Sequence, residues 1–431
     1  MKTICVLKRM IRIFGWTVGG VLLFVALLLG YLWIQSNRKV FLPAPMGSYA
    51  VGRTEYDWVD ETRSESLSKE LDAKRELAVW IWHPVTATQT PRPVVEYLPG
   101  NWRKAREQGQ GIAARFLMQN LGSVGVHVIA DAPVAPTHPS YPVLIFEPGL
   151  GPIATDYTTL AEDLASHGYI VVACTPTYSA SVVVFPDGRI AYGTKEGSVP
   201  DAASVEASNE ILNRLINVWA ADDLFVLNQL EKLNQTDPSG KFTGRLDLKS
   251  VGVFGHSFGG CAAAQACRLD SRFRAGVDID GYPRGDVIQA GISQPFMFIW
   301  SVHTENPEKP DAELRQATRN IQAIYGKLNH GGYQITVNGA RHFNFTDNGV
   351  FYSPFLKMEQ ALGPINGRRA LMISTDYLSA FFDRYLKGDD EPLLKGPSLK
   401  YPEAQFESVI RVNSLLGTQF INRKRGQFVF C

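Results

Sequence analysis

The sequence is poor in cysteine and contains no metal-binding motif. Its five cysteines lie far apart and include no Cys-x-x-Cys pair, so they imply no disulfide framework. Cys261 and Cys267 fall at a spacing that would point them to different faces of one helix. No His-Glu-x-x-His run is present. We therefore expect no metal ion in this protein.

An excess of charge of one sign is also lacking. The chain has 43 basic and 42 acidic residues, a net charge of +1, and neither sign gathers in a long block. A nucleic-acid-binding surface needs a basic patch, so we expect no nucleic acid as a partner. No internal repeat is apparent either. The 431 residues predict one large catalytic domain, residues 41–431, after a separate N-terminal segment, residues 1–40.

The N-terminal segment contains a long uncharged apolar run, Phe14–Ile34, which is long enough to cross a bilayer as a helix. Aromatic residues suited to a membrane interface lie near its ends: Trp16, Tyr31 and Trp33. The basic residues before the run are Lys2, Lys8, Arg9 and Arg12, and those after it are Arg38 and Lys39. This bias predicts a cytoplasmic N-terminus and a catalytic domain on the extracytoplasmic side. A cleaved signal peptide is the alternative, but Gln35-Ser36-Asn37 supplies no small-x-small cleavage site, so we expect an uncleaved single-pass anchor.

The most informative stretch is Val251–Gly260, an apolar run that ends in Gly-His-Ser-Phe-Gly-Gly. A serine hydroxyl is a weak nucleophile, so it must be held on a sharp turn beside a base and N–H donors. Such a turn needs small residues two positions before and two after Ser257, and both are glycine. Val251–Phe254 is predicted as a buried strand and Cys261–Cys267 as a small-residue helix. The stretch indicates a nucleophile elbow with Ser257 as the nucleophile.

Strand and helix patterns alternate through most of the chain after an expected antiparallel pair, Thr54–Val59 and Leu77–His83. This alternation is typical of an α/β fold with a mostly parallel sheet flanked by helices. The strands predicted in the alternating part are Val143–Phe146, Tyr169–Ala173, Val251–Phe254, Ala275–Ile279, Pro295–Trp300 and Gln334–Val337. The predicted helices are Arg103–Leu121, Asp156–His167, Asn209–Leu233, Cys261–Cys267, Asn306–Leu328 and Tyr377–Leu386. Residues 179–208 interrupt the alternation and form either a lid over the site or a plain surface loop.

A glycine-rich loop follows the first strand of the alternating part. Gly149-Leu150-Gly151-Pro152-Ile153-Ala154 formally matches a dinucleotide-binding fingerprint, but it also suits an oxyanion loop whose backbone N–H faces a reacting carbonyl. A nucleotide site would need an acidic residue at the end of the next strand, where Cys174-Thr175-Pro176-Thr177 has none. We therefore expect an oxyanion loop and no nucleotide cofactor.

His342 is the predicted general base. In the α/β-hydrolase plan the chain order is nucleophile, acid and base, each on a loop at the carboxyl end of a strand. His342 directly follows the last predicted strand of the alternating series. The other histidines do not fit this order. Four of them precede Ser257, namely His83, His127, His138 and His167, and His256 lies in the elbow itself. His303 comes one strand too early, and His330 precedes its strand.

The predicted acid is Asp280, which ends the strand after the elbow helix and is followed by a glycine. Asp278 lies on the same face of that strand two residues earlier and is either the acid or a buried structural carboxylate. Glu305 follows the next strand, another position where an acid is found. The acid fixes the histidine tautomer and stabilises the imidazolium. All three candidates stay open at this point.

Several separate motifs together resemble one family. The chain from Pro45 to about Gly388 is similar to the platelet-activating factor acetylhydrolase group of α/β hydrolases, which also includes bacterial esterases and lipases. The matching pieces are residues 47–52, 148–151, 163–169 and 255–260, Asp280, residues 294–295, and His342 with residues 344–345. The resemblance implies an α/β-hydrolase fold, a Ser257–Asp280–His342 triad, and the backbone N–H groups of Leu150 and Phe258 as the oxyanion hole.

The sequence departs from this group at two places. Glu147-Pro148 stands where the group often has a histidine before Gly-Leu-Gly, and one residue is missing after Asp280 relative to the animal enzymes.

The function expected is a membrane-anchored serine ester hydrolase acting on lipid or short-chain carboxylic esters. A broad carboxylesterase, lipase or polyester hydrolase uses identical machinery. A non-catalytic membrane-tethered binding protein with the same fold is the alternative from another class.

Overall fold

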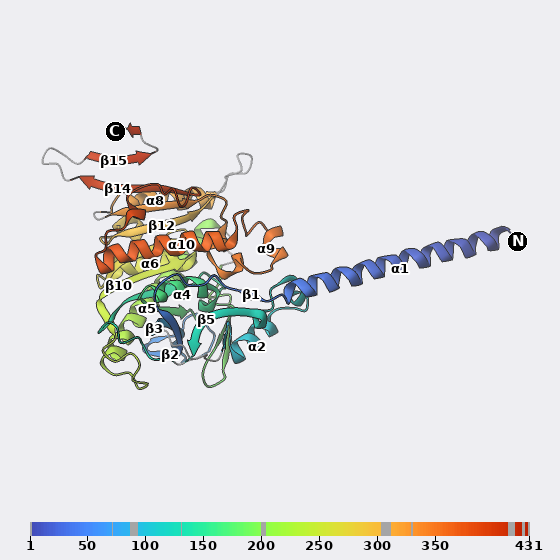
Figure 1. Cartoon of the computed structure of the whole chain (residues 1–431), viewed down its shortest axis with the longest axis horizontal. Coiled ribbons are helices and arrows are strands. Elements are labelled where there is room, and N and C mark those ends of the chain that lie inside the picture. The colour runs from blue at the N-terminus through green and yellow to red at the C-terminus, as the bar shows by residue number, and fades with distance from the viewer. Residues whose placement is uncertain are drawn as a thin grey trace.

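A long, mostly parallel sheet organises the domain (Figure 1). The computed structural model describes residues 2–70, 72–86, 94–130, 132–199, 204–302, 312–328, 331–412, 419–424 and 427–429. The strands are β1 (Val40–Phe41), β2 (Ala50–Ser64), β3 (Lys74–Val85), β4 (Val94–Glu96), β5 (Val124–Ala130), β6 (Tyr141–Glu147), β7 (Ile170–Thr175), β8 (Val182–Val184), β9 (Ile190–Tyr192), β10 (Leu246–His256), β11 (Phe273–Ile279), β12 (Phe296–Ser301), β13 (Gly332–Val337), β14 (Ala404–Val412), β15 (Gln419–Lys424) and β16 (Gln427–Val429). Their order in the main sheet is β1-β5-β2-β3-β7-β6-β10-β11-β12-β13-β14-β15-β16, with β4 beside β5.

The central strands β7, β6, β10, β11, β12 and β13 are all parallel to their neighbours within this group. Parallel strands end at the same edge of a sheet, so the loops after β6, β10, β11, β12 and β13 meet there. The long hairpin β2–β3 is antiparallel and attaches to β7 through β3. This geometry gathers the predicted site residues, which all follow those central strands.

Helices cover both faces of the sheet. The helices of the described residues are α1 (Lys2–Ser36), which projects away from the sheet, α2 (Gly100–Gly109), α3 (Ala114–Leu117), α4 (Thr158–Ser166), α5 (Val205–Gln235), α6 (Phe258–Leu269), α7 (Val287–Ala290), α8 (Ala312–Tyr325), α9 (Pro354–Met358) and α10 (Gly367–Phe382). Short 3₁₀ or π turns are η1 (Leu121–Ser123), η2 (Ala154–Tyr157), η3 (His342–Phe345), η4 (Asp347–Gly349), η5 (Asp383–Lys387) and η6 (Pro392–Leu394).

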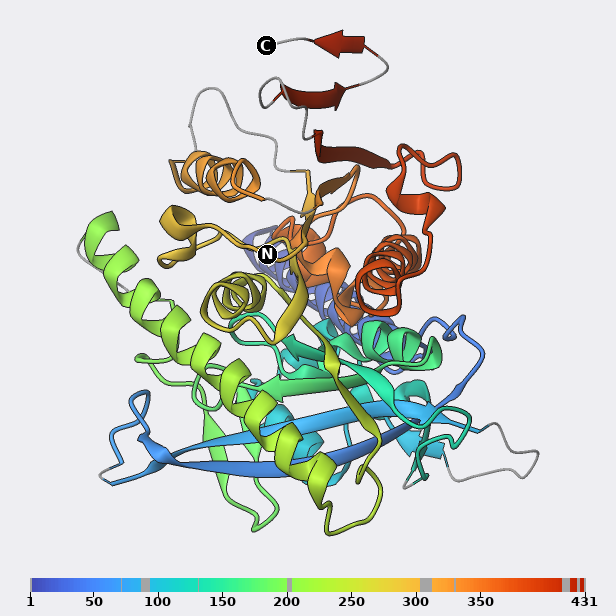
Figure 2. The ribbon, with the colours of Figure 1, turned by 90° about the vertical axis from the view of Figure 1, so that its left-hand side faces the viewer.

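Alternating strand residues build two separate cores. Phe146 and Phe254 pack with α4 and α10 on one face, whereas Ile145 and Val253 pack with α5, α6 and α8 on the other. Successive side chains of a strand point to opposite faces, so a strand covered on both sides is apolar throughout. Figure 2 shows α5 lying along its face of the sheet.

Most of the predicted elements are present, with different ends. The antiparallel pair is confirmed as β2–β3, and the elbow strand is longer than predicted because β10 begins at Leu246. The helix predicted over Arg103–Leu121 is wrong as one helix, because the chain forms α2, α3 and η1, with Gly109 at the end of α2 and Gly111 between α2 and α3. The helix predicted from Tyr377 begins ten residues earlier, at Gly367. Residues 395–431, for which nothing was predicted, add β14 antiparallel to β13.

Helix α1 leaves the domain as one long rod (Figure 1). Its segment Arg9–Ser36 is long and apolar enough to cross a membrane, a test that a signal sequence also passes. The last turn of α1 belongs to the folded domain, because Ser36 is fully buried and its Oγ donates to the carbonyl oxygen of Arg115 at 2.9 Å. The backbone N–H of Asn120 donates to the carbonyl oxygen of Ser36 at 2.8 Å.

Candidate active site

Ser257 lies on a strained turn between β10 and α6. Its backbone has φ 58° and ψ −122°, a conformation that is costly for a residue with a side chain. A Cβ on Gly255 would lie 2.2 Å from the carbonyl carbon of Gly259, and one on Gly259 would lie 2.2 Å from the carbonyl oxygen of Glu147. Backbone atoms at that distance cannot yield, so the two glycines are required by close packing of the helix against the strands. The turn holds Ser257 half-buried at the carboxyl edge of the sheet.

Asp280 and His342 lie in direct contact at that edge. His342 Nδ1 is 2.8 Å from Asp280 Oδ2, although the two residues come from different loops. The Asp280 carboxylate also accepts hydrogen bonds from Ser301, from the backbone N–H at 2.8 Å and from Oγ at 3.0 Å. Donors placed around a buried carboxylate stabilise its charged form. Asp280 itself has φ 55°, so the chain turns sharply as it leaves β11.

Asp278 occupies a different environment from Asp280. It is fully buried, and its Oδ1 accepts from the backbone N–H of Gly281 at 2.8 Å. Burial, reinforced by the neighbouring charge of Asp280, raises the pKa of Asp278 well above its ordinary value. Asp278 packs against Gly260 of α6, and among the described residues no hydrogen bond joins it to His342, whose Nδ1 contacts Asp280 instead. Glu305 lies outside the described residues.

His256, the residue before the serine, connects three loops. Its Nδ1 lies 2.8 Å from Tyr157 Oη, and its Nε2 lies 3.0 Å from the carbonyl oxygen of His342. Burial, together with His342, lowers the pKa of His256 to about 3, so its imidazole is neutral and carries one proton. A carbonyl oxygen can only accept, so that proton lies on Nε2 and Tyr157 donates to Nδ1. The Tyr157 oxygen then accepts from the backbone N–H of Gly149 at 3.0 Å.

The sequence does not predict this chain of hydrogen bonds, because Tyr157 there is only a residue near the start of the predicted helix Asp156–His167. We expect Tyr157→Phe to lower kcat by about 10- to 100-fold with little change in KM, because small displacements of reacting groups have effects of that size. Steady-state kinetics on a soluble acetyl ester would measure this. Tyr141→Phe is a matched control, since it also removes a buried hydroxyl, one that donates to Ala135 at 2.9 Å. Equal kcat in Tyr157→Phe and wild type would contradict the expected role.

Two backbone N–H groups close to Ser257 in the fold have no acceptor in the described part of the chain: that of Phe258, the next residue, and that of Leu150, which follows Gly149 beside the serine. Gly149 N–H donates to Tyr157, and Gly151 N–H donates to the carbonyl oxygen of Ser179 at 3.0 Å. The N–H of Leu150 between them, and that of Phe258 at the start of α6, have no hydrogen bond among the described residues. Free donors at a helix start can receive an oxyanion.

The family can now be identified from comparison with known proteins. The model of the family described as platelet-activating factor acetylhydrolase, isoform II, matches residues 34–392. The chain belongs to the platelet-activating factor acetylhydrolase family. Its glycine-rich loop, elbow and the loop of His342 all lie inside the matched range. The resemblance read from the separate motifs is confirmed.

The individual relatives of this chain have low sequence identity to it. A probable 1-alkyl-2-acetylglycerophosphocholine esterase of Arthroderma benhamiae is 28% identical over 62% of this chain and 66% of that protein, just under two thirds of its length. The platelet-activating factor acetylhydrolase of Cavia porcellus is 27% identical over 68% of this chain and 73% of that protein. A ferulic acid esterase from Streptomyces cinnamoneus has a similar structure, with a TM-score of 0.68, 28% identity, and coverage of 86% of this chain and 99% of that one. The predicted α/β-hydrolase-like fold and the ester hydrolase class are thereby confirmed.

A buried acidic cluster lies behind the glycine-rich loop of this family member, at the place where the sequence departs from the family pattern. Glu147 ends β6 and is fully buried beside Asp222 and Asp223 of α5. Burial, with the charges of Asp223 and Asp222, raises the pKa of Glu147 well above its ordinary value, although Arg75 opposes the shift. Burial and Asp222 likewise raise the pKa of Asp223. These shifts favour the protonated form of Glu147 in the folded protein.

Glu147→Gln should flatten the pH dependence of stability. The folded protein binds this proton more tightly than the unfolded chain, so the stability that Glu147 contributes is fully present below the ordinary carboxyl pKa of about 4.3 and is lost as pH rises above it. Removing one such group reduces the slope of the free energy of unfolding against pH by up to about 1.4 kcal/mol per pH unit. Thermal unfolding of the full chain in detergent between about pH 5 and about pH 8 would measure this. The exposed Glu196→Gln is the control, and an unchanged slope in Glu147→Gln would refute a protonated Glu147.

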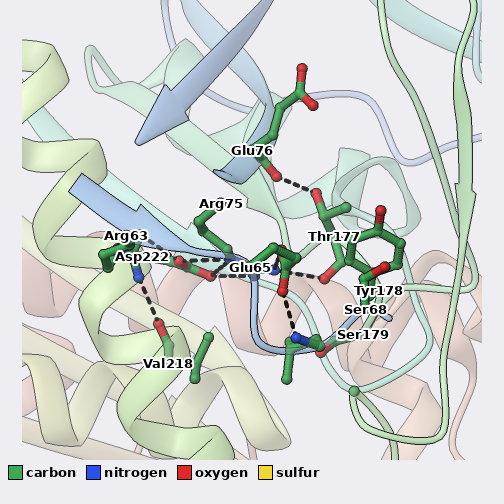
Figure 3. A network of polar contacts seen from close by, with 12 residues as sticks. Arg63, Glu65, Ser68, Arg75, Glu76, Thr177, Tyr178, Ser179, Val218 and Asp222 are labelled. Carbon is green, nitrogen blue, oxygen red and sulfur yellow. Dashed lines mark hydrogen bonds and ion pairs between the residues drawn. The ribbon is translucent and has the colours of Figure 1, made fainter. Parts of the chain in front are cut away.

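An ion-pair network fixes the segment that follows β7 (Figure 3). Buried Arg75 of β3 bonds Asp222 Oδ2 at 2.5 Å and Glu65 Oε2 at 3.0 Å, and it donates to the carbonyl oxygen of Thr177 at 2.8 Å. Burial lowers the pKa of Arg75, but the two carboxylates outweigh it and raise the pKa overall. The network joins the β2–β3 hairpin, α5 and residue 177. Residues 178–181 then continue along the glycine-rich loop, where the Ser181 N–H donates to Gly151 at 2.6 Å.

Proposed function

We propose that this chain is a membrane-anchored serine ester hydrolase in which Ser257, His342 and Asp280 form the catalytic triad. The observation that carries the proposal is the contact of 2.8 Å between His342 Nδ1 and Asp280 Oδ2 at the sheet edge that also presents the strained Ser257. That contact places a proton on Nδ1 and leaves Nε2 as the nitrogen that accepts the proton of Ser257.

The reaction follows from these roles. Ser257 Oγ attacks the ester carbonyl as His342 takes its proton, and the N–H groups of Leu150 and Phe258 bind the oxyanion. The protonated His342 then gives its proton to the departing alcohol. A water molecule, activated by the same histidine, hydrolyses the acyl-enzyme and releases the acid. Asp280 stays ionised throughout and stabilises the imidazolium.

The substrates we propose are lipid esters with short acyl chains, as in platelet-activating factor, because the family model covers most of the chain. A broad carboxylesterase is the second candidate, favoured by the structural similarity to a ferulic acid esterase. Residues 179–199, the described part of the segment expected to be a lid or a surface loop, would form a fixed rim beside the site, because the Ser181 N–H donates to Gly151 and Thr194 Oγ1 donates to the carbonyl oxygen of Leu67, both at 2.6 Å.

We propose that α1 stays attached as a single-pass anchor and that the domain faces the extracytoplasmic side. The buried Ser36 and its bonds to residues 115 and 120 support retention, since cleavage after Ser36 would remove a residue that is part of the folded domain. The basic residues before the apolar run support the orientation. The test is a reporter enzyme that works only in the cytoplasm, fused after Cys431. Activity of this reporter would contradict the proposed orientation.

Activity-based labelling tests the proposed function directly. We expect a fluorophosphonate probe to label the full chain once, at Ser257, as mapped by mass spectrometry of peptides. Folded protein without label at Ser257 would refute the enzymatic proposal and favour a binding protein. Turnover of acetyl, butyryl, octanoyl and lauroyl esters, and of phospholipids with acetyl or long chains at the second carbon, would separate the substrate classes. A preference for long chains would contradict the short-chain proposal.

A further inference from the structure

A cavity lies where the anchor helix enters the domain. Its volume is about 270 Å³, and it is enclosed by the end of α1 on one side and by α2, α3 and η1 on the other. The lining residues with charged or aromatic side chains are Trp33, Arg103, Arg106, Glu107 and Arg115. None of the proposed catalytic residues takes part in it. Its chemistry is therefore separate from that of the active site.

We propose that this cavity binds the head group of a zwitterionic phospholipid. The apolar segment Arg9–Ser36 ends at the cavity wall, so in a chain anchored by α1 the cavity lies at the level of the lipid head groups. The inference rests on the membrane anchorage proposed above and not on the catalytic assignment. A head group of this class carries one phosphate and one ammonium group, and the cavity offers partners for both.

Two arginines are available for the phosphate. Arg106 is not, because its Nη1 is 2.6 Å from Asp156 Oδ1 and that pair is largely buried. Arg103 makes only long contacts, 3.6 Å to Glu96 Oε1 and 3.7 Å to Glu107 Oε1. Arg115 is exposed, and its side chain has no ion pair among the described residues. The planar guanidinium binds phosphate through two parallel hydrogen bonds, which makes Arg103 and Arg115 suited to this group.

The same cavity also contains groups that can bind the ammonium group. Glu107 is half exposed, 52% at its side chain, and can face an ammonium group. The Trp33 ring, 55% exposed, offers an aromatic face to the same cation. With Arg106 neutralised by Asp156, the lining keeps Arg103 and Arg115 for a phosphate and Glu107 for an ammonium group, which are the two charges that a zwitterionic head group carries.

The cavity is preformed by contacts that tie its two walls together. Asn120 Nδ2 donates to Asn37 Oδ1 at 2.7 Å, and Ser36 Oγ donates to the carbonyl oxygen of Arg115 at 2.9 Å. Gln119 Nε2 donates to the carbonyl oxygen of Arg38 at 2.8 Å. A site whose walls are already fixed loses little entropy when it binds. A lipid bound there would fix the orientation of the domain relative to the bilayer, which one helix alone leaves free.

Native mass spectrometry of the full chain in detergent tests this inference. Ser257→Ala is used as the background so that added lipid is not hydrolysed, and the ligands are phosphatidylethanolamine, phosphatidylglycerol and inorganic phosphate. We expect one phosphatidylethanolamine to be retained per chain, and at least about five-fold less in Arg103→Gln/Arg115→Gln, as expected for the loss of charge-assisted hydrogen bonds. The matched control is Arg268→Gln/Arg384→Gln, which removes two exposed arginines elsewhere.

Each other outcome has a defined meaning. Equal retention in the two double variants, stronger retention of phosphatidylglycerol, or binding of inorganic phosphate alone would each overturn the proposal. Arg103→Lys/Arg115→Lys keeps the charges without the planar fork, so we expect intermediate retention, and it replaces the glutamine variant if that one does not fold. Lipid retained by a wild-type chain that cleaves no ester would refute the proposed function and leave this inference intact.

Discussion

Ser257→Ala should abolish ester hydrolysis, lowering kcat by about 10⁵- to 10⁶-fold while leaving substrate binding largely unchanged. The alanine keeps the elbow backbone but removes the oxygen that forms the acyl-enzyme, so only oxyanion binding and proximity remain. His342→Ala should cause a loss of similar size, because without a base the serine keeps its proton. Residues that act as one unit are not additive, so the double variant should be no slower than either single variant.

The measurement is turnover of a soluble acetyl ester by the full chain in detergent, with thermal unfolding as the check on folding. His167→Ala is a suitable control, because His167 is a partly exposed histidine whose Nδ1 lies 2.8 Å from the carbonyl oxygen of Asp163, outside the site. Ser257→Ala with kcat within about ten-fold of wild type would show that another group is the nucleophile, because losses of a true nucleophile are far larger.

Asp280→Asn should lower kcat by about 10⁴-fold, whereas Asp278→Asn should change it by less than about ten-fold. His342 Nδ1 lies 2.8 Å from Asp280 Oδ2. In the variant the asparagine amide can donate to Nδ1, and the ring proton then moves to Nε2, where it blocks transfer from Ser257. Burial raises the pKa of Asp278 well above its ordinary value, which favours its neutral form, and asparagine has the same shape as that form.

The comparison between these two variants decides the acid. The structure separates Asp280 and Asp278 by their partners, Ser301 and His342 for the first and the Gly281 N–H for the second. Glu305→Gln is added as a third arm because Glu305 also follows a strand of the sheet. Loss of turnover in Asp278→Asn or Glu305→Gln with normal turnover in Asp280→Asn would show that the acid has been assigned wrongly.

Much of the fold could be predicted because its signals are local. A strand buried on both faces is apolar over its whole length, as in Phe296–Ser301, and an elbow needs glycines at 255 and 259 whatever surrounds it. The ends of helices were predicted less well. The start of α10 at Gly367 depends on the Asn366 side chain, which accepts from two backbone N–H groups of the first turn, a signal that a surface loop asparagine also gives.

For the candidate site, too, local signals could be predicted from the sequence and contacts between distant residues could not. The sequence predicts the nucleophile, the order of the loops and the long apolar helix, since each depends on residue type and spacing along the chain. The sequence does not show which carboxylate lies against His342, because a strand continued through Asp280 would put Asp278 and Asp280 on one face. In the structure β11 ends at Ile279 and the chain turns at Asp280, φ 55°, which brings Asp280 into contact with His342. The tertiary structure alone also joined Tyr157, His256 and His342, and placed the arginine-lined cavity at the end of α1, because these contacts connect residues far apart in the sequence.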